Sequence, residues 1–159
     1  MDDPKTNPDA PQHYVGTGWC SEQSIGYLMK QALNSIKAEA DDEMAEHGLT
    51  DAQWQPLHAI SQSKVGTASD VARRINCDTG ALTRMLDRLE EKGLIARTRS
   101  SEDRRVVHLK LTAEGERAVS IVPHVLADVL NRRLRDFSSA EVDQLKGMLR
   151  RMIAAGRNK

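Results

Sequence analysis

Aromatic residues are scarce in this sequence, where two Trp, two Tyr and one Phe make up 3% of 159 residues. A core with so few rings must be built from Leu, Ile, Val, Met and Ala, which favours helices packed on helices. No apolar run approaches the length needed to cross a membrane. The length fits one domain of ordinary size, or a small domain with helical extensions.

Cysteine is nearly absent as well. Cys20 and Cys77 have no CxxC spacing and predict no disulfide framework, which favours a cytoplasmic protein. The five His are scattered without ligand spacing such as HxxxH, so neither a metal nor a cofactor is expected. The acidic, Pro-rich start differs from a signal or transit peptide and predicts a flexible arm over residues 1–20.

Patterns typical of enzymes are missing: there is no set of nucleophile, base and orienting residue, no Gly-rich phosphate loop and no paired-carboxylate motif. We therefore do not expect catalysis. The formal net charge of zero gives no support for a nucleic-acid partner either. The charge distribution is more informative, because basic residues outnumber acidic ones over 71–110 while acidic residues dominate 1–51. DNA responds to local potential, so a basic patch is sufficient.

The stretch from 67 to 112 is the most informative part of the sequence. A capping pattern, Thr67-x-x-Asp70, precedes a short amphipathic helix, and Asp78 is a suitable N-cap for a second helix that ends at Gly93. Two β-rich runs follow, 94–99 and 106–111, joined by a polar turn. This order predicts a winged helix-turn-helix: a mainly α fold with a small β-hairpin wing.

The flanking segments are helical with apolar stripes. We expect a long helix over about 21–46, and a short or kinked helix after Thr50-x-x-Gln53 because of Pro56. A helix over about 112–137 should bend at Pro123, and a last helix should follow Ser138-x-x-Glu141. The predicted divisions are a flexible arm (1–20), a dimerisation helix (21–49), a DNA-binding winged helix (50–112) and C-terminal dimerisation helices (113–159). One copy offers these stripes little to pack on, which favours a two-fold dimer.

The second helix of the helix-turn-helix has the residues that a DNA-reading helix needs. Gly80 allows close backbone approach, while Thr79, Thr83 and Arg84 can reach bases or phosphates. Arg84 is the best candidate for base reading and Arg88 suits a phosphate. Arg73 and Arg74 on the preceding helix are weaker candidates for backbone contacts. The alternative is an ordinary solvated face, with Asp87 and Glu91 pairing Arg84 and Arg88 at helical spacing.

The tip between the two β-rich runs carries Asp103, Arg104 and Arg105. An arginine on a projecting hairpin fits the narrow, strongly negative minor groove, and a carboxylate two residues away can hold its orientation. The alternative is a charged tip that keeps a strand edge soluble.

The run GALTRMLDRLEEKGLIARTRSSEDRRVVHLKLTAEG resembles the core of the MarR family (multiple antibiotic resistance regulators), and the similarity extends over about residues 21–155. Its most specific part is the D-x-R tip followed by L-T-x-x-G. The resemblance implies an obligate homodimer on pseudo-palindromic promoter DNA, a repressor in most members, released by ligands or oxidants. It assigns Arg105 to the minor groove with Asp103 as its orienting partner, and places Thr79, Gly80, Thr83 and Arg84 at the major groove.

The control of DNA binding is less defined by the sequence. The family resemblance implies a small phenolic or lipophilic acid bound between the dimerisation helices and the winged helix, where Tyr27, Trp54 and His58 are candidate lining residues; the alternative is that they belong to the core. A redox-responsive regulator is a second hypothesis, although Cys20 lies ahead of the first helix and Cys77 fits an inert turn position. A winged helix that binds an acidic protein partner instead of DNA is a third.

Overall fold

The computed structural model describes residues 13–62, 66–101, 103 and 106–156. Two compact units are distinguished, one up to Ser35 and one from Ile36 onward. In the first unit a single 3-10 turn, η1 (Ser21–Gln23), precedes α1 (Ile25–Glu46), which runs on into the second unit. The Ser24 hydroxyl accepts the backbone N–H of Tyr27 at 3.2 Å and so caps the first turn of α1.

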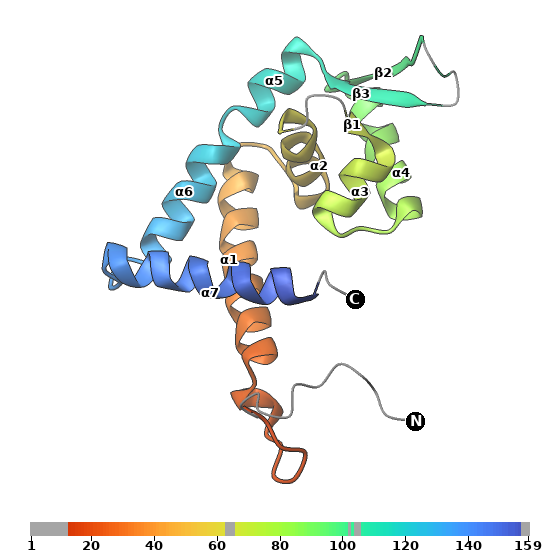
Figure 1. Ribbon diagram of the computed structural model, residues 1–159. Coiled ribbons are helices and arrows are strands. Elements are labelled where there is room, and N and C mark those ends of the chain that lie inside the picture. Colours follow the sequence, from red (N-terminus) through yellow and green to blue (C-terminus); the bar gives the residue numbers. More distant parts are fainter. Residues whose placement is uncertain (1–12, 63–65, 102, 104–105, 157–159) are drawn as a thin grey trace, which may run out of the picture. The chain divides into compact units, whose positions relative to one another are not determined.

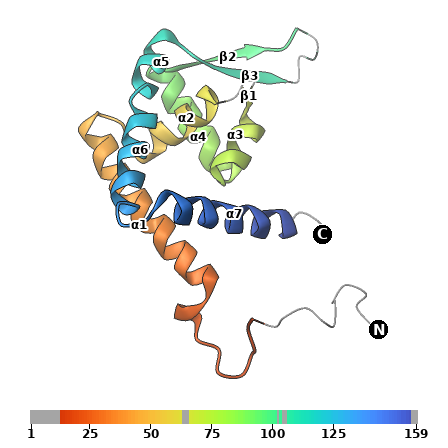
Figure 2. The same ribbon diagram turned by 60° about the vertical axis from the view of Figure 1, so that its left-hand side comes forward.

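The second unit contains the winged helix. Three helices, α2 (Asp51–Ser61), α3 (Ala68–Ile75) and α4 (Thr79–Glu91), are followed by the strands β2 (Ile95–Arg99) and β3 (Val107–Leu111). Figure 1 shows α2, α3 and α4 gathered beside the sheet, and Figure 2 shows β2 and β3 extending away from these helices as a hairpin. The predicted fold, mainly α with a small β wing, is confirmed.

The sheet has one strand more than the sequence suggested. Gly66 and Thr67 form a short strand, β1, which pairs antiparallel with β3 opposite Leu109 and His108. The strand order is β1-β3-β2, and Arg97 in β2 lies opposite Leu109 in β3. Thr67 ends this strand and also caps α3, because its hydroxyl accepts the Asp70 N–H at 3.2 Å. One residue therefore joins the sheet to the helix-turn-helix.

The long helix expected over about 112–137 is two helices instead of one bent helix. α5 (Ala113–Val119) and α6 (Val122–Arg133) are separated at Ser120–Ile121, and Pro123 lies in the first turn of α6. A proline is tolerated there because the first N–H groups of a helix have no intrahelical acceptor. In contrast, Pro56 lies buried inside a continuous α2, which is short, as expected.

Aliphatic side chains form the core, as the composition predicted. Leu57, Leu82 and Leu89 are completely buried, and Met44 of α1 and Val129 of α6 are equally inaccessible. Burial of each such side chain stabilises the fold by about 1.5–3 kcal/mol. The C-terminal helix α7 (Ser139–Gly156) has no buried residue, although its predicted capping box is present: Ser138 N–H donates to Glu141 Oε2 at 2.7 Å.

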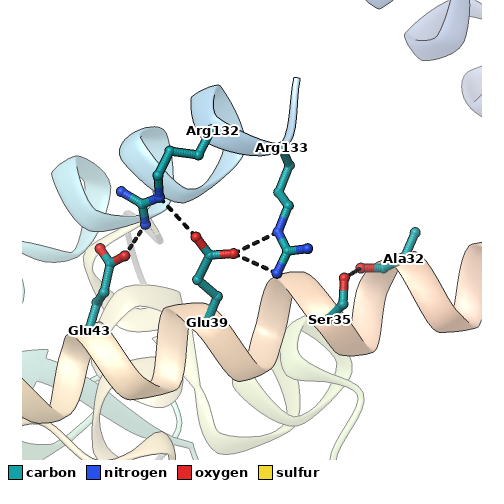
Figure 3. Close-up of polar contacts among 6 residues, drawn as sticks. All are labelled: Ala32, Ser35, Glu39, Glu43, Arg132 and Arg133. Carbon is teal, nitrogen blue, oxygen red and sulfur yellow. Dashed lines mark hydrogen bonds and ion pairs between the residues drawn. The ribbon is translucent and has the colours of Figure 1, made fainter. Parts of the chain in front are cut away.

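Charged side chains join α1 to α6 in this unit. Arg132 Nε donates to Glu39 at 2.9 Å, Arg133 Nε donates to the other Glu39 oxygen at 2.6 Å, and Arg132 also pairs with Glu43 (Figure 3). The hydrogen bond from Arg132 holds the pKa of Glu39 below its ordinary value. The acidic end of α1 is thus matched by the basic end of α6, where cations also interact favourably with the helix dipole.

Candidate nucleic-acid interface

Helix α4 is positioned by a cap at its start and an apolar face along its length. Asp78 Oδ1 accepts the Ala81 N–H at 2.9 Å, as predicted for an N-cap. Leu82, Leu86 and Leu89 are at most 1% exposed, so this face is fixed against the core. Gly93, with φ of +68°, ends the helix in the left-handed conformation that glycine adopts without strain.

The opposite face of α4 is open to solvent. Thr79, Gly80, Thr83, Arg84 and Arg88 are all exposed. The Thr83 hydroxyl donates to the Thr79 carbonyl at 2.8 Å, leaving its lone pairs available. Neither Arg84 nor Arg88 makes a hydrogen bond or ion pair with any residue that the structure describes, so the pairing of these arginines with Asp87 and Glu91 is not seen.

The preceding helix carries Arg73 and Arg74, both exposed. Arg73 pairs with Asp70 at 3.0 Å, yet its side chain remains 77% exposed. The turn between α3 and α4 contains Asn76 in the left-handed region (φ +52°) and the half-buried Cys77, whose thiol donates to the Asp78 carbonyl at 3.4 Å.

A contact that the sequence analysis missed joins the wing to α4. Arg97 of β2 donates to Asp87 at 2.7 Å and to Glu90 at 2.8 Å. The alternation of side chains along a strand could have predicted this contact. Ile95 is buried, and Arg97, two residues later, lies on the same face of the strand, toward the helices. Asp87 and Glu90 therefore have a partner outside their own helix.

The base of the wing tip is closed by backbone hydrogen bonds. Ser100 N–H donates to the Val106 carbonyl at 2.9 Å, and Val106 N–H donates to the Asp103 carbonyl at the same distance. Asp103 is exposed, and its own N–H donates to the Ser100 hydroxyl at 3.3 Å. Arg104 and Arg105 lie outside the described residues, so their predicted roles remain predictions.

The L-T-x-x-G motif is explained by packing. The Thr112 hydroxyl donates to the Gly93 carbonyl at 2.6 Å, its N–H donates to the Leu94 carbonyl at 3.1 Å, and its Oγ accepts the Gly115 N–H at 3.0 Å. A Cβ at Gly115 would lie 1.9 Å from the Leu94 carbonyl oxygen. The motif therefore holds the start of α5 against the turn between α4 and β2.

The three candidate pocket residues have different surroundings. Tyr27, in the first unit, is 37% exposed. Trp54 is 9% exposed and its indole N–H donates to Asp41 at 2.8 Å. His58 is half-buried and its Nδ1 has no hydrogen-bond partner among the described residues; burial lowers the pKa of this imidazole, with a further contribution from the charge of Arg74.

A hollow of about 350 Å³ lies between α1, α2 and the turn before α4. It is lined by Lys37, Asp51, Gln55, Ile75, Asn76, Cys77, Asp78 and Met85. The ammonium of Lys37 bridges Asp41 at 3.1 Å and Asp51 at 3.0 Å. Across the part of the chain that the structure covers, no three His, Cys, Asp or Glu gather as a metal set, and no helix has the length and apolarity to cross a bilayer.

The winged-helix region is similar in sequence to known proteins. Residues 49–107 match the family model "MarR family". The HTH-type transcriptional repressor MdtR of Bacillus subtilis is 41% identical over 90 residues, which are 56% of this chain and 58% of MdtR. The chain thus spans little more than half the length of that curated relative.

Solved structures of regulators extend the likeness over most of the chain. The transcriptional regulator PA3341 has a TM-score of 0.79 at 28% identity, over 86% of this chain and all of its own. A cysteine-to-serine mutant of MarR from E. coli, complexed with operator DNA, has a TM-score of 0.71 at 26% identity, over 80% of this chain and 91% of its own. These relatives and the matched family are transcriptional regulators and not enzymes. The sequence motifs, the winged-helix topology and these likenesses together identify a MarR-family winged helix in residues 49–107.

Proposed function

We propose that the protein is a sequence-specific DNA-binding transcriptional regulator, a repressor, in which α4 enters the major groove and the wing reaches the adjacent minor groove. The observation that carries the proposal is the face of α4 opposite the buried leucines. Small residues (Thr79, Gly80 and Thr83) leave room on this face, and the guanidinium groups of Arg84 and Arg88 pair with no residue that the structure describes. In our proposal Arg84 reads a base, Arg88 contacts a phosphate, and Arg104 and Arg105 act from the wing with Asp103 orienting Arg105. Arg73 and Arg74 add backbone contacts.

The proposed active form is a homodimer on pseudo-palindromic DNA. Its support is the apolar surface outside the winged helix: Leu28 and Leu33 of α1 are 55% and 66% exposed, and Met152 and Ile153 of α7 are 47% and 59% exposed. A monomer rarely leaves this many large side chains in water, and a two-fold contact between copies would cover them.

Selection from a random duplex library tests DNA reading. The wild-type protein should enrich one motif with two-fold symmetry and bind it more tightly than a scrambled duplex, with affinity that falls steeply with salt. Arg84→Ala should relax the preference at one position per half-site, worth about 1–3 kcal/mol of discrimination. The matched control is Arg135→Ala, which removes an arginine that is 78% exposed and follows the end of α6. Equal binding of the selected and scrambled duplexes would contradict the proposal.

We further propose that a small phenolic or lipophilic acid releases the DNA. The hollow lined by Lys37 supports this, because its volume of about 350 Å³ suits a small ligand and it adjoins Asp78, the N-cap of α4. A carboxylate that replaced Asp51 on Lys37 would alter the contact between α1 and α2. The proposed roles of Tyr27, Trp54 and His58 in ligand binding remain predictions.

A thermal-shift screen of aromatic acids tests the effector. An acid that binds the folded state should raise the melting temperature and weaken DNA binding in the same concentration range. Lys37→Met should abolish both effects, whereas Lys30→Met, on α1 in the first unit, should change neither. An acid that acts equally on the Lys37→Met protein would exclude this location.

A further inference from the structure

The contact of Arg97 with α4 has a consequence for DNA reading, which rests on the function proposed above. Arg97 places one guanidinium between two carboxylates, with N–O distances of 2.7 Å to Asp87 and 2.8 Å to Glu90. Its side chain is 30% exposed, less than either partner carboxylate at 49% and 40%. An arginine fork that engages two carboxylates is held in place more firmly than a single exposed ion pair.

Asp87 has another arginine within reach on its own helix. Arg84 lies three residues before it, and side chains three apart on a helix are neighbours that form ion pairs when their charges are opposite. In the structure Arg84 makes no such pair with any described residue, and Asp87 faces Arg97 instead. When Asp87 pairs with Arg97, it is not available to form an ion pair with Arg84.

We propose that Arg97 is a positioning residue for DNA reading: by holding Asp87 and Glu90, it prevents Asp87 from capturing Arg84 and keeps the base-reading guanidinium available. Arg97 acts through Arg84 and does not itself contact a base. A captured Arg84 would have to break its ion pair before it could donate two hydrogen bonds to a guanine, so affinity for the preferred sequence falls while the fold is retained. Neutralising the two carboxylates also removes repulsion between α4 and the DNA phosphates.

The test compares four proteins on the duplex selected by the wild-type protein and on a scrambled duplex of the same composition. Arg97→Gln should weaken binding to the selected duplex by roughly tenfold, the cost of losing one good base contact. Asp87→Asn in the Arg97→Gln background should restore affinity to near the wild-type value, because no carboxylate is left to capture Arg84. Asp87→Asn alone should bind at least as tightly as the wild type.

Arg99→Gln is the matched control, since it removes an exposed arginine two residues further along the same strand. Any loss that it causes should persist when Asp87→Asn is added. A second readout is the selected motif: Arg97→Gln should lose preference at the base pairs where Arg84→Ala loses it, which a purely structural role would not reproduce. Circular dichroism and thermal melts establish that each variant is folded.

Two outcomes overturn the inference. If the double variant remains as weak as Arg97→Gln, Arg97 contacts DNA itself or only supports the wing. If Arg97→Gln binds the selected duplex like the wild type, the ion pairs have no role in reading. Both results leave the proposed function intact, whereas a wild-type protein that selects no motif sinks the proposed function itself.

Discussion

Helices α4 and α7 have similar amphipathic patterns but different surroundings. In α4, Leu82, Leu86 and Leu89 are buried between α2, α3 and β2. In α7, the corresponding stripe of Leu145, Met148, Met152 and Ile153 is 41–59% exposed. The periodicity of a helix thus fixes which face is apolar, and only the rest of the fold decides what covers that face. Among the residues that the structure describes, one copy of the chain buries the apolar face of α4 and leaves the apolar face of α7 exposed.

Truncation of a buried leucine should have the largest effect. Leu86→Ala removes a side chain that is 1% exposed and should lower the free energy of unfolding by about 2–5 kcal/mol, through lost burial and the cavity left behind. Denaturation in urea measures it, and the loss should be the same at every protein concentration. Met148→Ala on α7 is the control; an equally large loss there in dilute protein would remove the contrast between the two helices.

A methyl group at Gly115 should be the next most damaging change. The added Cβ would lie 1.9 Å from a backbone oxygen, so the start of α5 must move away from Leu94. Overpacking of this kind costs about 1–3 kcal/mol. Thermal unfolding of Gly115→Ala should show the loss, whereas Gly147→Ala, where a Cβ meets nothing within 4 Å, should be neutral or slightly stabilising.

A charge on the stripe of α7 should affect association more than folding. Ile153→Glu adds a carboxylate to a face that the proposed dimer buries, and should raise the dimer dissociation constant about tenfold or more. Arg150→Gln changes the net charge by the same amount on an exposed position and should leave the dimer unchanged. Light scattering over a dilution series measures both. A monomeric wild-type protein would contradict the expectation.

Acidification should destabilise the winged helix and α7 over different pH ranges. This effect should be smaller than the effects of the substitutions above. Burial lowers the pKa of His58 below its ordinary 6.5, so the unfolded chain binds the extra proton first and the winged helix loses stability as pH falls below that value. Hydrogen bonds from Ser138 lower the pKa of Glu141 below 4.5, so its contribution to α7 is present above pH 4.5 and lost as pH falls through the lowered pKa. Urea denaturation at pH 7.5 and 5.5 should detect the first effect, and His58→Gln should reduce it.

An NMR titration of Glu141 measures the second effect. Ser138→Ala should return the pKa of this carboxyl toward its ordinary value, because both the hydroxyl and the ordered backbone N–H of residue 138 donate to it. A pKa that stays low in the variant would show that the capping box is not the cause.

Local rules predicted most of the winged helix. Capping patterns at Thr67 and Asp78 and the leucine spacing of α4 depend only on nearby residues, and the structure confirms them. The two-residue strand β1 was not predicted, because Gly66 and Thr67 are extended through pairing with β3, a partner some forty positions away in sequence. The break between α5 and α6 was not predicted: one helix bent at Pro123 was expected, but that proline lies in the first turn of α6, where it does not bend a helix.

The candidate interface was predicted in part. The exposure of Thr83 and Arg84 followed from the helical period, whereas the partner of Asp87 did not. Helical spacing suggested Arg84, and the strand geometry supplied Arg97 instead. Contacts between a helix and a neighbouring strand depend on how the sheet packs, which spacing along the chain does not encode.

The close approach of Gly115 to the Leu94 carbonyl packs the start of α5 tightly against the turn between α4 and β2. Thr112 ties it with three hydrogen bonds, and no atom can be added between the glycine and the Leu94 carbonyl. A rotation of α5 should therefore displace Leu94, the residue immediately before β2. In a paired molecule, the tilt of the helices that join two copies would set how far apart the two hairpins reach.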